Sequence, residues 1–218
     1  MNNKIFSEVG KQYGYERVKV EFVPYTQFKI QWSRSYKRIE FRVSDYLENA
    51  PENIMRDLAT ELFSKINGDN YGYSDDFKAY VLAPEFSQTH RKTFMERNRF
   101  IYTESENKNL ADSVNRLVKA GLLPENHNIE VVWDHSYGCD LASTYSVLMR
   151  VILVNYQLDD KDVPDYTIDY AIYHDYLNIE AGSKVFDTDD EMDIREDLTK
   201  FEKCAEAEKE LDKRCLAL

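Results

Sequence analysis

The chain has 218 residues, enough for one large domain or two small ones, and its 43% hydrophobic residues and 16 Tyr are typical of an ordered globular protein. A formal charge of -12 argues against sequence-independent nucleic-acid binding, which needs a surplus of Lys and Arg facing phosphate. The three Cys form no even disulfide framework, the N-terminus lacks an apolar signal core, and no run reaches the roughly 18 apolar residues of a membrane span. We therefore expect a cytoplasmic protein with reduced thiols and no membrane association.

Residues 17–47 are predicted to form mainly strands. Apolar and charged side chains alternate along 18–22 and again along 39–43, which is the period of a strand with one buried face. The segment 29–34 also has an extended pattern. The first part of the chain is therefore expected to be rich in strands.

A first helix is predicted after Pro51, because the fixed backbone angle of proline suits the first helical position. Apolar residues then recur at every fourth position from Ile54 to Ile66, and Gly68 ends the helix. A turn-rich loop follows, and a second helical stretch covers roughly 75–83.

The rest of the chain is predicted to be richer in helices. Its elements are expected in this order: a helix over 108–121, a short strand over 129–133, a strand over 147–154 that is rich in β-branched residues, a helix over about 165–180 that begins after Pro164, and a long charged helix over 191–214. The mild change in composition predicts an N-terminal α+β part over 1–104 and a second part over 105–218. The alternative is a single compact domain.

The helix over 165–180 carries the clearest chemical signal, Tyr-His-Asp-Tyr-Leu-Asn at 173–178. Zinc proteases use the motif H-E-x-x-H on a helix, where two His one turn apart bind Zn²⁺ and the Glu acts as general base. Here His174 keeps the first ligand position, Asp175 replaces the Glu, and Asn178 replaces the second His.

The surrounding sequence resembles the SprT-like metallopeptidases of archaea, which are zincins. The family segment has a strand followed by L-D-x-x-x-V-P-x-x-x-x-D-Y-V-x-Y-H-E-L-L-H, and the resemblance covers about 145–211, with a looser similarity at 41–51. The matching positions are Leu158, Asp159, Val163, Pro164, Asp169, Tyr170, Tyr173, His174 and Leu177. The resemblance implies a zincin-like α+β fold with a mixed sheet, an active-site-type helix and a long C-terminal helix. It also implies that strand 147–154 is the substrate-side edge of the sheet.

The resemblance further implies a third metal ligand after the helix. The family has a His there, in a pattern like H-x-x-x-F-R-x-x-E-x-x-F followed by E-A-E. Aligning Arg195 and Phe201 with this pattern places Asp190 at the third ligand position. His174, Asn178 and Asp190 therefore occupy the ligand positions, and Asp175 occupies the position of the base.

These substitutions argue against tight zinc binding. Asp175 is one methylene shorter than Glu, and a misplacement of about an ångström costs a general base roughly a hundredfold in rate. Asn178 offers a neutral amide oxygen, which is a poor zinc ligand beside imidazole, whereas the carboxylate of Asp190 can bind zinc.

Three other patterns have simpler interpretations. The basic residues from His90 to Arg99 fit a solvated face of an acidic protein, and His135 and Cys139 are separated by Gly138, which interrupts a helix. Acidic residues at 187–193 lack the spacing of a calcium loop and suit a loop leading into a helix N-terminus. The tyrosines of the 165–180 helix, Tyr166, Tyr170 and Tyr173, are expected to pack in the core with their hydroxyls at a polar edge.

Three functional hypotheses follow. The first is a SprT-like relative with a degenerate zinc site, impaired in catalysis, that keeps a cleft for a peptide or protein, since an edge strand can bind an extended chain without chemistry. The second is a residual metal-dependent hydrolase that uses His174 and Asp190 around a loosely held zinc, with Asp175 as base. The third, nucleic-acid binding through residues 90–99, is the weakest because of the charge balance. Whether the protein is an enzyme stays open.

Overall fold

The computed structural model describes residues 2–69, 72–98, 105–135, 140–182 and 194–218. The chain divides into two compact units, Met1–Phe86 and Ser87–Leu218. Each unit combines helices with one small mixed sheet, so the chain has an α+β architecture. The division falls within a helix near residue 86, whereas the sequence placed the join near 104.

The first unit contains two helices and a three-stranded sheet, followed by shorter helical segments. Its elements are α1 (Asn2–Gln12), β1 (Arg17–Val23), β2 (Ile30–Ser35), β3 (Arg38–Ser44), the short 3-10 helix η1 (Asp45–Leu47), α2 (Glu52–Asn67) and α3 (Asp75–Leu82). The strands predicted between 17 and 47 and the helices predicted after Pro51 and over 75–83 are therefore present.

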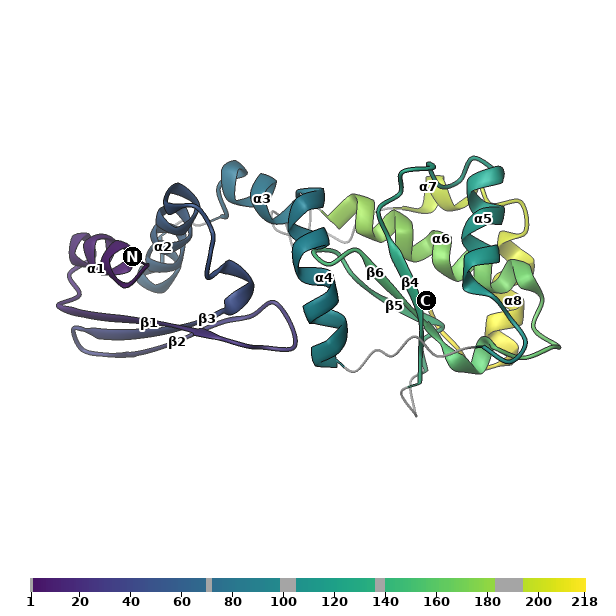
Figure 1. Ribbon diagram of the computed structural model, residues 1–218, viewed down its shortest axis with the longest axis horizontal. Helices are drawn as coiled ribbons and strands as arrows, with labels where there is room; N and C mark the ends of the chain where they lie inside the picture. Colours follow the sequence, from purple (N-terminus) through teal and green to yellow (C-terminus); the bar gives the residue numbers. More distant parts are fainter. Residues whose placement is uncertain (1, 70–71, 99–104, 136–139, 183–193) are drawn as a thin grey trace. The chain divides into compact units, whose positions relative to one another are not determined.

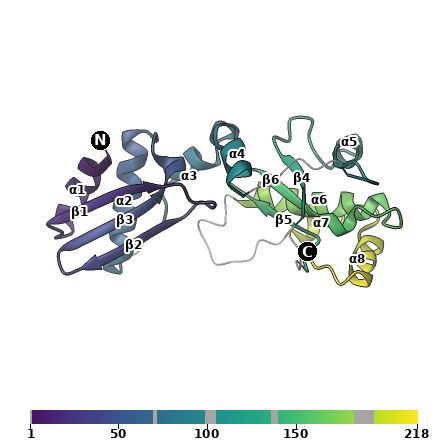
Figure 2. The same cartoon turned by 60° about the horizontal axis from the view of Figure 1, so that its bottom comes forward.

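The sheet of the first unit has the order β1-β3-β2, with β1 parallel to β3 and β2 antiparallel to it. Figure 1 shows α1 and α2 on one side of this sheet, and Figure 2 shows the three strands side by side. Phe6, Phe41 and Phe63 fill the space between the layers, with ring centroids about 5.2 Å apart. The alternation of apolar residues along β3 places one face of the sheet against the helices.

The second unit contains the candidate site. Its elements are the greater part of α4 (Pro84–Asn98), α5 (Leu110–Lys119), β4 (Glu130–Asp134), β5 (Ser143–Ser146), β6 (Val151–Asn155), the 3-10 helix η2 (Tyr156–Leu158), α6 (Asp165–Ala181), α7 (Arg195–Leu198) and α8 (Cys204–Lys213). The sheet order is β4-β6-β5, with β4 parallel to β6 and β5 antiparallel to it.

The interpretation of 147–154 as the edge strand is wrong. Residues 147–150 form a turn in which Arg150 has a left-handed backbone (φ 54°), and strand β6 begins only at Val151. The turn is fixed because the Arg150 guanidinium donates to the carbonyls of His127 (2.8 Å) and Asn128 (3.0 Å). In the order β4-β6-β5 strand β6 is central, and all five of its residues are buried. The edges are β4 and β5, and β5 is a polar segment whose residues carry no strand signal.

The prediction of one continuous helix over 191–214 is also wrong for residues 194–214, which the structure describes. The chain forms α7 and α8 with an interruption at 199–203. Phe201 lies in the interruption and packs against the rings of Tyr170 and Tyr173, with centroids 5.3 and 6.2 Å away. The apolar spacing did not reveal the break, because Phe201 is buried just as a residue on the inner face of a continuous helix would be.

The basic stretch from His90 lies on α4, which the sequence analysis did not predict as a helix. Arg91 is not part of a solvated face, since its side chain is only 15% exposed and donates to the carbonyls of Met149 (2.9 Å) and Asn128 (2.8 Å). Lys92 lies 4.0 Å from Glu96 on the helix surface. Arg99 is outside the described residues.

The loop before β4 contains a histidine whose titration affects stability. The neutral Nδ1 atom of His127 accepts a hydrogen bond from the Ile129 amide at 3.2 Å. Burial, and next the positive charges of Arg150 and Arg91, lower the pKa of this imidazole. Its contribution to stability is therefore complete above the unfolded pKa of about 6.5 and is lost as the pH falls from there through the lower folded value.

We expect the melting temperature of the wild type to fall more steeply than that of His127→Asn between about pH 7.5 and about pH 5. The Asn side chain can still accept a hydrogen bond but does not titrate in this range. Thermal unfolding at several pH values measures the difference. Identical pH profiles for the two proteins would contradict the assignment.

Candidate functional site on helix α6

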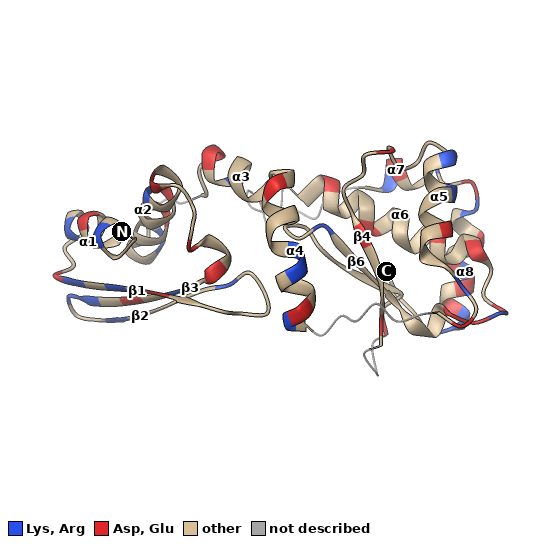
Figure 3. Cartoon of the chain, viewed as in Figure 1, with Lys and Arg blue, Asp and Glu red and all other residues tan. Residues whose placement is uncertain are grey.

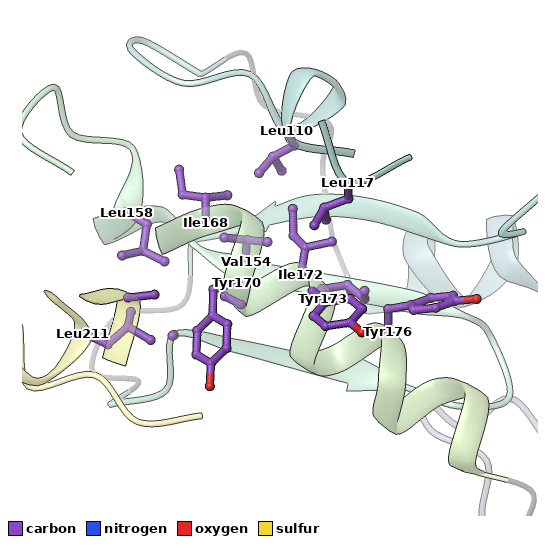
Figure 4. Packing of buried hydrophobic residues seen from close by; sticks show 14 of the residues in the cluster. Leu110, Leu117, Val154, Leu158, Ile168, Tyr170, Ile172, Tyr173, Tyr176 and Leu211 are labelled. Atoms are coloured by element: carbon purple, nitrogen blue, oxygen red, sulfur yellow. The ribbon is translucent and has the colours of Figure 1, made fainter. Parts of the chain in front are cut away.

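Helix α6 is held by three buried polar and aromatic anchors. Asp169 forms a bidentate ion pair with Arg116 of α5, at 2.7 and 2.8 Å. The Tyr170 hydroxyl donates to Glu208 of α8 at 2.8 Å, and the Tyr173 hydroxyl donates to the carbonyl of Asp197 at 3.1 Å. Figure 4 shows these tyrosines within the cluster of buried side chains around α6. The expectation that Tyr170 and Tyr173 pack in the core with polar hydroxyl partners is confirmed.

His174 and Asn178 lie one turn apart on the same face of α6. The Asn178 amide nitrogen donates to the backbone carbonyl of His174 at 3.2 Å and lies 3.5 Å from its Nδ1 atom. The amide is thus directed back along the helix toward the residue one turn earlier. In this arrangement the Asn178 amide bonds to the helix backbone. It does not point to a place where it and the Nε2 atom of His174 could bind the same metal ion.

Asp175 is buried, with 2% of its side chain exposed, and its Oδ1 atom lies 3.0 Å from Nδ1 of His174. When Asp175 is ionised its carboxylate only accepts, so the Nδ1–H of His174 donates and Nε2 faces away from Asp175. Among the described residues no group bonds to Nε2, and the second oxygen of Asp175 has no partner either. Asp175 therefore orients the imidazole, a role that carboxylates often have behind catalytic or metal-binding histidines.

Asp190 and the other acidic residues at 187–193 lie outside the described residues, as does Cys139. Within the part of the chain that the structure describes, no three His, Cys, Asp or Glu side chains come together as a metal site. His174 offers one suitable nitrogen, while Asn178 and Asp175 are engaged elsewhere, so the described residues by themselves do not fit a bound zinc ion.

A pocket of about 330 Å³ lies against the exposed side of His174. It is bounded by α6, α7, α8 and the segment that follows α8. The lining residues are Tyr170, His174, Leu198, Glu208, Leu211, Asp212 and the three residues 216–218. The pocket gives the imidazole access to a small volume with both apolar and acidic walls.

The segment after α8 pairs with the sheet edge close to this pocket. The chain leaves α8 through a left-handed residue, Cys215 (φ 56°), and Ala217 then forms a parallel bridge with Leu141. Two main-chain hydrogen bonds of 2.7 Å hold it, from the Ala142 amide to Ala217 and from the Ala217 amide to Asp140. This contact is not predictable from the sequence, because a short coil segment carries no periodic signal.

Edge strand β5 connects this bridge with the buried carboxylate. Tyr145 of β5 is 41% exposed, and burial followed by the negative charge of Asp175 raises the pKa of its hydroxyl. Leu141, Tyr145 and Leu218 are among the few large apolar residues that remain exposed in the described structure. Ala217 thus belongs both to the bridge with Leu141 and to the wall of the pocket beside His174, and Tyr145 lies within the electrostatic reach of Asp175.

Comparisons of the chain with protein-family models, with curated proteins and with solved structures give no match. Across the described ranges, no helix is both long enough and apolar enough to cross a membrane.

Proposed function

We propose that the second unit is a SprT-like zincin scaffold whose zinc site is degenerate, and that it binds an extended peptide or protein segment along edge strand β5. The observation that carries the proposal is the pairing of Ala217 with Leu141, in which main-chain hydrogen bonds hold a segment of the chain itself beside the residues that directly precede β5. The bridge is parallel, so a strand that continued its line would run beside Ser143–Ser146.

The arrangement of the edge and the helix supports the proposal. Strand β5 is antiparallel to its neighbour and packs against α6, which carries His174. Strand addition takes its affinity from main-chain hydrogen bonds and its specificity from pockets for alternate side chains. The pocket beside His174 and the exposed ring of Tyr145 are suitable contacts for such side chains.

The geometry around Asp175 weighs against the peptidase chemistry of the motif. A general base must face the water that it activates, but Asp175 is buried and bonds to His174. The alternative, a residual metal-dependent hydrolase using His174 and Asp190, is favoured by one observation, that Asp175 leaves Nε2 of His174 open. In that case Asp175 orients the ligand, and another group has to serve as base.

We expect Tyr145→Glu to weaken the binding of unstructured peptides by about tenfold, because an aromatic contact in the centre of an interface is worth more than about 1 kcal/mol. The measurement uses an array of overlapping decapeptides that cover the sequence of β-casein. Tyr36→Glu is the matched control, since Tyr36 is 91% exposed and lies in the first unit.

Peptides that bind are then resynthesised with N-methyl groups on alternate amides. One of the two alternating sets should abolish binding, because each methyl group removes a main-chain donor needed for strand pairing. Binding that survives both methylated sets, or that is equal for Tyr145→Glu and the wild type, would refute strand addition at β5.

A further inference from the structure

The pocket beside His174 has a distinctive combination of walls. Leu198, Leu211 and Leu216 provide apolar surface, and Glu208 and Asp212 provide two carboxylates from one face of α8. None of its described lining residues is Lys or Arg. Figure 3 shows the acidic residues along α8, and the second unit holds most of the chain's surplus of acidic residues.

The carboxylate of Glu208 keeps room for a further donor. It accepts from the Tyr170 hydroxyl at 2.8 Å, and a carboxylate has about four acceptor positions. The thiol of Cys204 has one proton, and its two acceptors are the Tyr170 hydroxyl at 3.2 Å and Glu208 at 3.6 Å. Asp212 is exposed, and among the described residues its side chain makes no hydrogen bond or ion pair. Both carboxylates can therefore take a donor from a ligand.

Two cations at the end of α8, Lys213 and Arg214, are engaged with other acids, while Lys209 follows Glu208 in the sequence and does not line the pocket. Lys213 lies 2.7 Å from Glu210, and Arg214 lies 3.3 Å from Glu210 and 3.9 Å from Asp160. These pairs are on the side of α8 away from the pocket, because Glu210 is not among the lining residues. Among the described residues neither Glu208 nor Asp212 forms an ion pair, and no Lys or Arg lines the pocket.

We propose that this pocket binds a lysine or arginine side chain of an extended peptide. These side chains combine an apolar stem with a cationic head, which matches leucine walls that lead to carboxylates. Ala217 both lines the pocket and pairs with Leu141, so a peptide bound at the same edge can direct one side chain into the pocket. This inference rests on the proposed function, and it specifies which peptides bind.

The test compares four synthetic peptides that differ only at the central residue: acetyl-Val-Thr-Lys-Thr-Val-amide and its arginine, norleucine and glutamate analogues. Norleucine keeps the alkyl stem of lysine and removes the charge. We expect the lysine and arginine peptides to bind about tenfold or more tighter than norleucine, as hydrogen bonds to charged groups are worth roughly 1.5–3 kcal/mol. The glutamate peptide should bind most weakly.

The double variant Glu208→Gln/Asp212→Asn should remove this preference by weakening the lysine peptide about tenfold while leaving the norleucine peptide unchanged. Its matched control is Glu196→Gln/Glu206→Gln, which changes the net charge equally at two exposed positions that do not line the pocket. The control should retain the preference, since long-range attraction to an acidic chain would be reduced equally in both.

The outcomes separate the two proposals. Equal binding of the lysine and norleucine peptides that is lost in Tyr145→Glu would overturn the lysine pocket and keep strand addition. A lysine preference that depends on Glu208 and Asp212 but not on Tyr145 would keep the pocket and overturn strand addition. If both double variants lost the preference for lysine equally, the preference would come from the net charge of the chain, and the lysine pocket would be overturned. Absence of binding by all four peptides at millimolar concentration would overturn both.

Discussion

We expect Asp159→Ala to destabilise the protein by roughly 1–3 kcal/mol, the cost of leaving hydrogen-bond donors without their acceptor. The carboxylate of Asp159 is buried and accepts from the main-chain amides of Glu106, Asn107 and Lys108 at 2.7, 3.0 and 2.7 Å. Removing it leaves these amides without their acceptor and releases the loop that leads into α5.

Denaturant unfolding of Asp159→Ala beside Asp162→Ala measures this effect. Asp162 lies in the same acidic loop but is exposed, and its substitution should change the unfolding free energy by less than about 0.5 kcal/mol. Both variants remove one negative charge. If they were equally stable, the hydrogen bonds of Asp159 would contribute nothing to stability.

Asp159 illustrates how the matched motif positions contribute to this fold. Leu158 and Val163 are fully buried, Pro164 precedes the first residue of α6, and Asp169 pairs with Arg116. These positions fix where α6 begins and how it packs against α5 and α8. The positions on which the proposed SprT-like relationship rests are thus positions that build a scaffold, whereas the motif is altered at Asp175 and Asn178, where chemistry would occur.

The elements that sequence patterns located well are those with many residues on one buried face. Helix α5 ends before Gly121, which has a left-handed backbone (φ 71°), and helix α2 ends before Gly68 (φ 81°), as glycine signals at helix ends predict. Strand β5 could not be found this way, because its Ser-Thr-Tyr-Ser sequence shows neither alternation nor enrichment in apolar residues. Its strand conformation comes from pairing with β6, a long-range contact that local sequence does not encode.

For the candidate site, the sequence predicted only which residues share one face of α6. The four-residue spacing placed His174 and Asn178 together, and the described structure has them one turn apart. The hydrogen bond from His174 to Asp175 was not predicted, since neighbouring residues on a helix usually point in different directions. The involvement of residues 216–218 depends on the left-handed turn at Cys215, which a non-glycine residue adopts only when its surroundings enforce it.

The largest expected change concerns zinc. We expect the wild type to contain zinc well below one ion per chain, and Asn178→His/Asp190→His to bind zinc at least about a hundredfold more tightly, because each imidazole replaces a weaker oxygen ligand. Position 178 lies one turn from His174, and Asp175 already holds Nδ1 so that Nε2 is open to a metal. The measurement is a zinc titration against a chelating competitor, with elemental analysis of the purified proteins.

Two further variants locate the new site. Adding His174→Ala to the double variant should lower the affinity again, because one of three imidazoles is lost. Adding Asp175→Glu instead restores the motif but inserts a methylene at a side chain that is 2% exposed, so we expect it to cost about 1–3 kcal/mol of stability and to weaken the orientation of His174. Unchanged zinc affinity in a folded Asn178→His/Asp190→His protein would mean that position 190 does not return to α6, and the third ligand position would then be wrong.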